Sequence, residues 1–173
     1  MSIIFRKLEV ADSILYRNIR LKCLQTFPDN FGSTFEEESK IEKLKFEVFL
    51  KEENTDNFMF GAFDGEKLIG ICGFSRELRA KTEHRGEIVQ MFVDPQYTSK
   101  NIGFELLQKT IEKAFKNAAI EQIVLSVVAE NKAANRLYEK LGFIEYGLLK
   151  NYFKKDEIYW RQRFMVLNRK YEI

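Results

Sequence analysis

The segment from Val93 to Phe115 contains residues that could bind a phosphate group. It leaves a hydrophobic strand at Pro95, continues as a short polar loop and enters an amphipathic helix through Gly103. A junction of this kind leaves backbone N–H groups pointing into solvent, and the helix N-terminus adds a partial positive charge. Ser99 and Asn101 occupy the two loop positions where glycine would most easily adopt the backbone conformation that such a site needs. The segment predicts a phosphate or pyrophosphate site, with an ordinary polar connection as the alternative.

The strands that would position this junction are marked by short runs of β-branched and aromatic residues. Two of these runs are joined by Asp64-Gly65-Glu66-Lys67, a sequence typical of a hairpin turn. Strands are expected over residues 3–8, 57–63, 67–74, 87–93, 122–129, 143–148 and 158–167. These strands, alternating with helical segments, predict an α/β fold with mixed strand directions.

Helices are expected between these strands. Apolar residues one turn apart predict a first helix, which Asp12 or Ser13 would cap. Residues 26–34 contain a proline and a glycine and would end it, and a second helix is expected over residues 35–51. The connection between these two helices could overhang a cleft in the sheet. The remaining helices are expected after Gly103 and between Asn131 and Gly142.

Composition narrows the class of protein. The chain of 173 residues is long enough for one domain, expected over residues 1–173. Its 28 basic and 26 acidic residues are interleaved, which argues against nucleic-acid binding. The sequence has no apolar run of about 18 residues, so we expect no membrane-spanning segment. It also lacks the apolar core of a signal peptide, so we expect a cytoplasmic location. One histidine and two separated cysteines predict no metal site.

A second pattern carries a family resemblance. Asn131 to Phe143 follows N-x-x-A-x-x-L-Y-x-x-x-G-F at every position. Together with Met91-Phe92-Val93-Asp94-Pro95, the loop through Gly103 and the order of elements, it resembles the GNAT superfamily of N-acetyltransferases. The resemblance implies an α/β (α+β) fold. Its central sheet would be mixed and mostly antiparallel, with about seven strands, helices on both faces and a splay at the cofactor site.

The loop before the second-last helix departs from the family pattern. Where members carry Arg or Gln, then Gly, then Gly or Ala, this chain has Thr98, Asn101 and Gly103, so only Gly103 conforms. Asn tolerates positive φ, so Asn101 is expected to adopt the left-handed conformation. Thr98 lacks a guanidinium for phosphate, a loss of about 1–3 kcal/mol that Lys100 would partly offset. Cosubstrate binding is therefore expected to be retained but weakened.

The resemblance implies acetyl-CoA as cosubstrate. Backbone groups of Met91 and Val93 would pair with the pantetheine arm like an added strand, and an N–H of Phe92 or Met91 would polarise the thioester carbonyl. Asn131 would cap its helix and also offer its amide to the arm. The expected contacts with acetyl-CoA are Met91, Phe92, Val93, Thr98, Ser99, Lys100, Asn101, Ile102, Gly103, Phe104, Asn131, Ala134 and Tyr138.

Two residues are candidates for proton transfer. Tyr138, a phenol with an ordinary pKa of about 10, is the candidate general acid for the departing thiolate, and helix packing is its alternative role. Glu87 is the candidate general base. Strict alternation along its strand would place it on the same face as Val89, Met91 and Val93. The alternative for Glu87 is an exposed glutamate at the start of a strand.

The acceptor pocket is implied to lie between residues 27–35 and the last hairpin, residues 150–159. Phe31, Glu87 and Tyr152 are its expected contacts. An aromatic, partly acidic rim would suit a cationic amine. The expected acceptor is a primary amine of a small molecule such as a polyamine, or of a protein N-terminus or lysine, attacking directly in a ternary complex. An edge strand near the C-terminus would allow a homodimer.

Two other classes of function remain open. A CoA-binding or sensing module with little or no turnover would be consistent with Thr98, Ser99 and Asn101 in the loop. The other class is an interaction domain that has kept only the fold. The two motifs together favour an acyl-CoA-dependent N-acetyltransferase.

Overall fold

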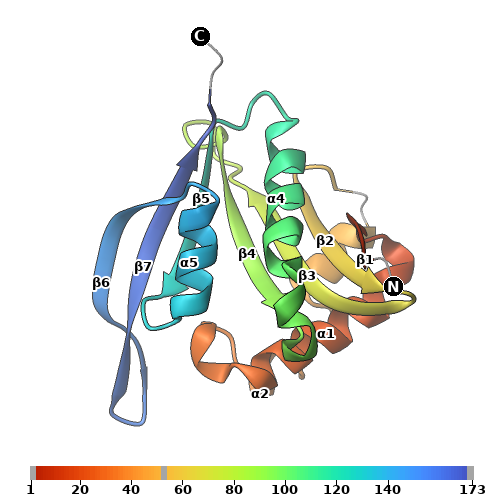
Figure 1. The fold of residues 1–173 in the computed structure, drawn as a ribbon, viewed down its shortest axis with the longest axis horizontal. Helices are drawn as coiled ribbons and strands as arrows, with labels where there is room; N and C mark the ends of the chain where they lie inside the picture. The colour runs from red at the N-terminus through yellow and green to blue at the C-terminus, as the bar shows by residue number, and fades with distance from the viewer. Residues whose placement is uncertain (1–2, 52–53, 171–173) are drawn as a thin grey trace.

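The computed structural model describes residues 3–51 and 54–170, apart from the side chains of residues 98–100. Seven strands form one open sheet in the order β1-β2-β3-β4-β5-β7-β6 (Figure 1). Neighbouring strands are antiparallel except for the parallel pair β4 and β5, which confirms the predicted mixed sheet. The strands are β1 (Ile3–Lys7), β2 (Asn57–Asp64), β3 (Lys67–Arg76), β4 (Arg85–Val93), β5 (Gln122–Val128), β6 (Ile144–Lys155) and β7 (Ile158–Asn168).

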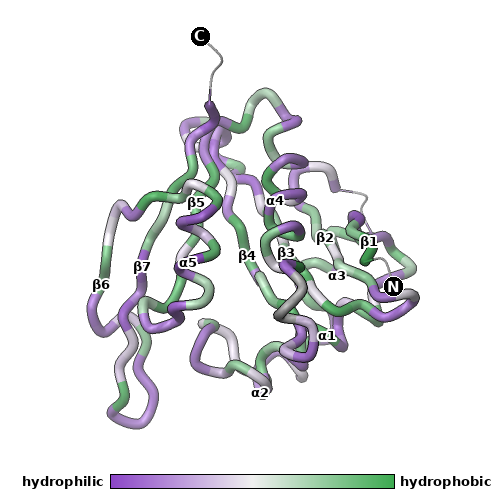
Figure 2. Tube along the Cα trace, in the orientation of Figure 1, coloured by the Kyte–Doolittle hydropathy of each residue, from purple (hydrophilic) through white to green (hydrophobic). Residues whose placement is uncertain are grey.

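Helices cover both faces of the sheet, and each face has its own hydrophobic core (Figure 1). Helices α4 and α5 pack on one face, while α1 and α3 pack on the other. Figure 2 shows hydrophobic residues along the central strands, where both faces are covered. The α-helices are α1 (Ser13–Thr26), α2 (Phe35–Glu38), α3 (Lys45–Lys51), α4 (Ile102–Phe115) and α5 (Lys132–Lys140).

The segment 35–51, predicted as one helix, forms the two helices α2 and α3. The side chain of Arg17 on α1 holds the residues between them in a non-helical path. The guanidinium of Arg17 donates hydrogen bonds to the carbonyls of Ile41 and Glu42, at 3.1 and 2.7 Å. These carbonyls therefore accept hydrogen bonds from a side chain instead of from the N–H groups of a continuing helix.

Strands β4 and β5 separate soon after they begin to pair. Their pairing is confined to Arg85–Glu87 and Gln122–Val124, and beyond it they diverge (Figure 1). From Ile88 to Val93 the edge of β4 that faces β5 therefore has no strand partner. The predicted splay is confirmed, and it leaves backbone hydrogen-bonding groups open along this edge.

Two strands carry β-bulges near this opening. Gln90 in β4 and Asn151 in β6 both have a φ of 55°, a left-handed conformation. The register of β4 against β3 shifts beside Gln90, and the register of β6 against β7 shifts between Leu149 and Phe153. A bulge bends a strand and re-aims its side chains. Both bulges therefore decide which side chains reach the opening.

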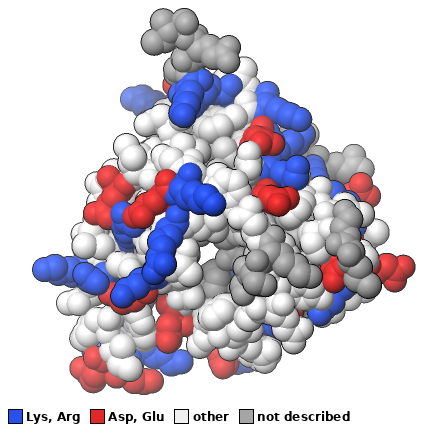
Figure 3. All heavy atoms as spheres, viewed as in Figure 1, with Lys and Arg blue, Asp and Glu red and all other residues white. Residues whose placement is uncertain are grey.

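Charged side chains of both signs are interspersed over the face of the molecule seen in Figure 3. Within residues 3–51 and 54–170 no helix is long and apolar enough to cross a bilayer. Among these same residues, no group of three or more His, Cys, Asp or Glu side chains is placed to hold a metal ion.

Candidate functional site

Two cavities adjoin at the splay. The first, here called the α4–α5 groove, has a volume of about 420 Å³ and is lined by Phe27, Asn30, Phe31, Met91, Phe92, Val93, Asn101, Gly103, Phe104, Asn131, Ala133, Ala134, Leu137 and Lys140. The second, here called the β4–β5 cleft, has a volume of about 360 Å³ and is lined by Arg20, residues 30–33, residues 87–91, Ser126, Val127, Tyr138, Tyr152, Phe153 and Gln162. Asn30, Phe31 and Met91 line both, so the two cavities meet at Met91.

The bulge at Gln90 reverses the alternation of β4. Before the bulge, Ile88 packs in the core under α4, whereas after it Met91 and Val93 pack against that core. Glu87, one residue before Ile88, therefore faces α1 and α3. The prediction that Glu87 shares a face with Val89 is confirmed. The prediction that it also shares this face with Met91 and Val93 is wrong, because strict alternation fails at a bulge.

Asp94 anchors the loop between β4 and α4. Its carboxylate is buried and accepts hydrogen bonds from Nζ of Lys22 at 2.6 Å and from the N–H of Gln96 at 3.2 Å. Burial acts to raise the pKa of Asp94, but these hydrogen bonds outweigh it and lower the pKa. A 3-10 helix, Pro95–Lys100, follows. The side chains predicted to contact acetyl-CoA from this turn lie outside the described residues: Thr98, Ser99 and Lys100.

The start of α4 opens onto the groove. Asn101 has a φ of 57° and a ψ of 12°, so its predicted left-handed conformation is confirmed. Outside the adjoining residues and the helix's own backbone, the atom closest to a Cβ added at Gly103 would be Cε of Met91, at 3.6 Å. Packing therefore does not require glycine here, and its lack of a side chain leaves space beside the helix N-terminus. Phe104 lines the groove, whereas the Ile102 side chain is buried in the core, which leaves only its backbone for a ligand.

Helix α5 forms the opposite wall of the groove. Oδ1 of Asn131 accepts a hydrogen bond from the N–H of Ala134 at 3.1 Å, which confirms the predicted cap. At the other end Gly142 has a φ of 92°, and the N–H of Phe143 donates to the carbonyl of Tyr138 at 3.1 Å. These features form a Schellman motif. The residues of the downstream motif thus fix both ends of the helix.

Five residues of the groove were not predicted from the sequence as contacts of either the cosubstrate or the acceptor: Phe27, Asn30, Ala133, Leu137 and Lys140. Nζ of Lys140 lies 4.6 Å from the centroid of the Phe104 ring, on the opposite helix. Lys140 is the one cation among the described residues that line the groove. Helical periodicity was a usable signal, because Ala133, Leu137 and Lys140 have the spacing i, i+4, i+7 of one face.

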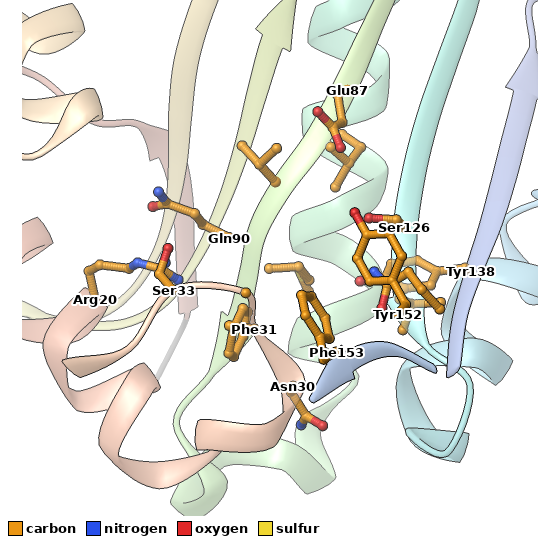
Figure 4. Close-up of a pocket in the computed structure, with 16 residues that line it drawn as sticks. Arg20, Asn30, Phe31, Ser33, Glu87, Gln90, Ser126, Tyr138, Tyr152 and Phe153 are labelled. Carbon is orange, nitrogen blue, oxygen red and sulfur yellow. The ribbon is translucent and has the colours of Figure 1, made fainter. Parts of the chain in front are cut away.

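Tyr138 reaches the cleft from α5 (Figure 4). Its side chain is buried, and its ring packs edge-on against Phe143 with centroids 6.0 Å apart. Burial raises the pKa of Tyr138 well above its ordinary value, so the phenol stays protonated at neutral pH. Tyr138 therefore packs in the core and also presents a protonated group to the cleft.

Glu87 enters the same cleft from β4, on the α1 face of the sheet (Figure 4). The residue is half-buried rather than exposed. Burial raises the pKa of Glu87; the positive charge of Lys45 opposes this shift and the negative charge of Glu77 adds to it. A carboxylate with a raised pKa is a better proton acceptor near neutral pH.

The connection between α1 and α2 and the β6–β7 hairpin close the remaining sides of the cleft, as predicted. The hairpin brings Tyr152, which follows the bulge at Asn151, to the cleft (Figure 4). A Cβ added at Gly32 would lie 3.1 Å from the ring of Phe153, so glycine lets the two segments touch. The three expected acceptor contacts, Phe31, Glu87 and Tyr152, line one cavity.

Two buried polar residues of the cleft were not predicted from the sequence. Arg20 donates from Nε and Nη2 to the carboxylate of Glu38, at 2.9 and 2.6 Å. Gln162 of β7 is also buried. The available signal was the position of Arg20 one turn after Tyr16 on the apolar stripe of α1, where a charged residue is unusual.

The sequence profile described as the Acetyltransferase (GNAT) family matches residues 20–143. The N-alpha-acetyltransferase 30 of Schizosaccharomyces pombe is 31% identical over 96 residues, which cover 56% of this chain and 63% of that protein. The spermidine N(1)-acetyltransferase of Thermoplasma acidophilum is 30% identical over 149 residues, which cover 83% of this chain and 89% of that protein. The chain thus spans less than two thirds of the N-alpha-acetyltransferase.

Solved structures share the fold. A putative acetyltransferase, yncA, from Salmonella typhimurium with its cofactor acetyl-CoA superposes with a TM-score of 0.83 at 16% identity, covering 100% of this chain and 97% of that one. An acetyltransferase of the GNAT family from Streptococcus pneumoniae gives a TM-score of 0.80 at 22% identity, with 96% and 99% covered.

Proposed function

The chain belongs to the Acetyltransferase (GNAT) family, and we propose that it transfers an acetyl group from acetyl-CoA to a primary amine. The amine attacks directly within a ternary complex. The observation that carries this proposal is the meeting of the groove and the cleft at Met91, beside the unpaired edge of β4. A donor in the groove and an acceptor in the cleft would hold their reacting groups next to each other, which is a large part of catalysis.

The groove fits acetyl-CoA, whose thioester supplies the activated acetyl group when it is bound. The unpaired edge of β4 from Ile88 to Val93 can pair with the amides of the pantetheine arm as an added strand. The left-handed Asn101 and the space beside Gly103 suit a pyrophosphate at the helix N-terminus. Lys140 offers a positive charge from the α5 wall, whereas Thr98 in the loop sequence is an uncharged residue.

Glu87 acts as the general base in this proposal. An ammonium group must lose a proton before it can attack a thioester. The carboxylate of Glu87 lines the cleft, and burial has raised its pKa. It takes the proton directly or through a water molecule.

Tyr138 acts as the general acid and gives its proton to the departing thiolate. The N–H of Phe92 or Met91 stabilises the oxyanion that develops on the thioester carbonyl. Tyr138 comes from α5 and Glu87 faces α1, so acid and base approach from opposite faces of the sheet. In this arrangement CoA leaves on one face while the acceptor enters from the other.

The acceptor is an amine of a small molecule, or of a protein N-terminus or lysine. The names of relatives support both kinds, because one is an N-alpha-acetyltransferase and another a spermidine N(1)-acetyltransferase. The aromatic side chains of Phe31 and Tyr152 at the cleft suit an amine that arrives as a cation.

The test is thiol release from acetyl-CoA with a panel of amines, together with thermal unfolding. Acetyl-CoA at about 100 times its Kd should stabilise the protein by roughly 2.7 kcal/mol, and at least one amine should give saturable thiol release. Stabilisation without turnover would instead favour a CoA-binding or sensing module. If acetyl-CoA neither stabilises the protein nor loses its acetyl group, the proposal is refuted.

A further inference from the structure

Two residues that line the β4–β5 cleft each have a buried polar atom without a hydrogen-bond partner among the described residues. These atoms are Nη1 of Arg20 and Oε1 of Gln162, whose residues are 3% and 5% exposed. Leaving a buried donor or acceptor unpaired is costly, so native structures contain few of them. Among the described residues four such side-chain atoms occur, and two belong to residues that line this one cavity.

The guanidinium of Arg20 is held as a fixed donor. Its Nε and Nη2 are occupied by Glu38, which orients the group and balances its charge. The Phe31 ring lies over it, with Cζ 5.3 Å from the ring centroid. The Cys23 thiol also contacts the Arg20 side chain as a weak acceptor, and it stays neutral because burial raises its pKa to about 12. Figure 4 shows Arg20 directed toward the cleft next to Ser33.

Gln162 provides the complementary group from the other wall. Its backbone is fixed in β7 by pairing with Val128 of β5 and Leu149 of β6. Ser126 of β5 and Tyr138 of α5 line the same cavity, so this wall is where the amine would meet the thioester. An acceptor that fills the cleft can therefore donate an N–H to Oε1 of Gln162 while another part of it reaches Arg20.

The two unpaired atoms distinguish between classes of amine. A polyamine carries only amines and methylene groups, so it would leave Nη1 of Arg20 without an acceptor. An α-aminoacyl group carries both N–H donors and a carbonyl oxygen. Because Glu38 already balances the charge of Arg20, a neutral carbonyl is as suitable a partner as a carboxylate.

We propose that the acceptor carries a carbonyl or carboxylate oxygen close to its reactive amine, as an amino acid or a peptide N-terminus does. This oxygen accepts a hydrogen bond from Nη1 of Arg20, and an N–H of the same molecule donates to Oε1 of Gln162. The assignment rests on the proposed transferase function and narrows its substrate class. It makes Arg20 and Gln162 determinants of specificity.

The first experiment changes the acceptor and leaves the protein intact. Thiol release is measured with L-alanine N-methylamide, with sec-butylamine as its carbonyl-free counterpart, and with spermidine. The amide is expected to exceed both by at least tenfold in kcat/KM expressed per neutral amine. This normalisation is needed because an α-amine, with a pKa of about 8, is neutral more often than an alkylamine, with a pKa of about 10.4. Equal or faster turnover of sec-butylamine or spermidine would overturn the assignment. Free L-alanine and an alanine-initiated tetrapeptide then distinguish an amino acid from a peptide N-terminus as the source of the oxygen.

The second experiment changes the protein. Arg20→Lys keeps a positive charge beside Glu38, and Gln162→Leu removes the acceptor oxygen. Each is expected to lower kcat/KM for the amide at least fivefold and to reduce its advantage over sec-butylamine. Arg17→Lys is the matched control, because Arg17 of α1 also pairs with a glutamate, Glu47 of α3, but does not line the cleft.

An unchanged advantage in both Arg20→Lys and Gln162→Leu would refute the assignment. If a variant does not fold, the first experiment, in which the wild-type protein is assayed with different acceptors, still tests the assignment. The two levels of inference fail differently. If thiol release occurs equally well with and without a carbonyl on the acceptor, only the proposed acceptor class is refuted. If no amine gives thiol release, both the transferase function and this inference are refuted.

Discussion

The hydroxyl of Tyr16 donates a hydrogen bond to Oε1 of Gln90 at 2.9 Å, and this bond links helix α1 to the bulge of β4. The two residues are 74 positions apart in the chain. Gln90 has a φ of 55°, which is unfavourable for a residue other than glycine and persists only where the surroundings enforce it. The bulge turns Met91 and Val93 toward α4. Tyr16 therefore supports the part of β4 on which the proposed acetyl transfer depends.

Tyr16→Phe should weaken this support. The variant leaves Oε1 of Gln90 without its donor, and we expect the free energy of unfolding to fall by about 1 kcal/mol. We also expect a lower kcat/KM for acetyl-CoA, because the bulge orients the open edge of β4. Urea unfolding and steady-state kinetics measure the two effects. Tyr146→Phe, at a residue 58% exposed, is the control. Loss of stability without a kinetic effect would show that the bulge does not need this bond.

Features with local causes were predictable from the sequence. The ends of α5 follow from Asn131 and Gly142, whose side-chain chemistry and freedom of φ act within one turn. The left-handed conformation of Asn101 follows from the same kind of argument. The hairpin between β2 and β3 also formed as expected, with Gly65 at a φ of 60°.

Features with long-range causes were not predictable. Nothing in the residues around Gln90 marks a bulge, since its support comes from Tyr16 on a distant helix. The face of Glu87 was therefore assigned wrongly. The break between α2 and α3 likewise depends on Arg17, and the buried pair of Arg20 with Glu38 depends on how two helices meet.

Substitutions at Asn101 should separate the conformation of the loop from its charge. Asn101→Gly removes the cost of positive φ and should bind acetyl-CoA at least as tightly as the wild-type protein. Asn101→Val places a β-branched residue at a φ of 57°, which costs on the order of 1–3 kcal/mol. We expect this variant to lower both Tm and affinity, measured by thermal unfolding and isothermal titration. Equal affinity of the two variants would mean that this turn does not hold the cosubstrate.

Lys140→Ala should weaken binding of acetyl-CoA without unfolding α5. Lys140 is exposed, so its attraction to a phosphate is screened and should amount to about 0.5–1 kcal/mol, or a roughly two- to fivefold rise in Kd. The difference from wild type should shrink as salt is added. Lys132→Ala is the matched control, because Lys132 is on the same helix but does not line the groove. Equal losses in both variants would argue for a general charge effect instead.

Tyr138→Phe should separate packing from proton transfer. The Phe ring keeps the contact with Phe143, so we expect Tm to stay close to that of the wild-type protein. Loss of a general acid should lower kcat by about 100-fold or more. Tyr159→Phe, at a residue 47% exposed, should keep full activity. If kcat is the same in Tyr138→Phe, the thiolate takes its proton from another group.

Glu87→Gln should change how stability depends on pH. Burial raises the pKa of Glu87, so the folded state binds this proton more tightly than the unfolded chain does. The charged carboxylate therefore costs stability above the folded-state pKa, and this cost disappears below the unfolded-state pKa of about 4.3. We expect the variant to be more stable than wild type at neutral pH and the gain to vanish near pH 4. Urea unfolding across this range tests it, with the exposed Glu83→Gln as control.

The same variant tests whether Glu87 is the base. In the wild-type protein kcat/KM should fall as the pH drops below the raised pKa of Glu87, because the protonated carboxyl cannot accept the proton of the amine. In Glu87→Gln the rate should be low at every pH, and this acid limb should be absent. Since the folded-state pKa governs both effects, the limb of the rate profile and the midpoint of the stability gain should fall at related pH values. A limb that persists unchanged in Glu87→Gln would assign the base to another group or to water.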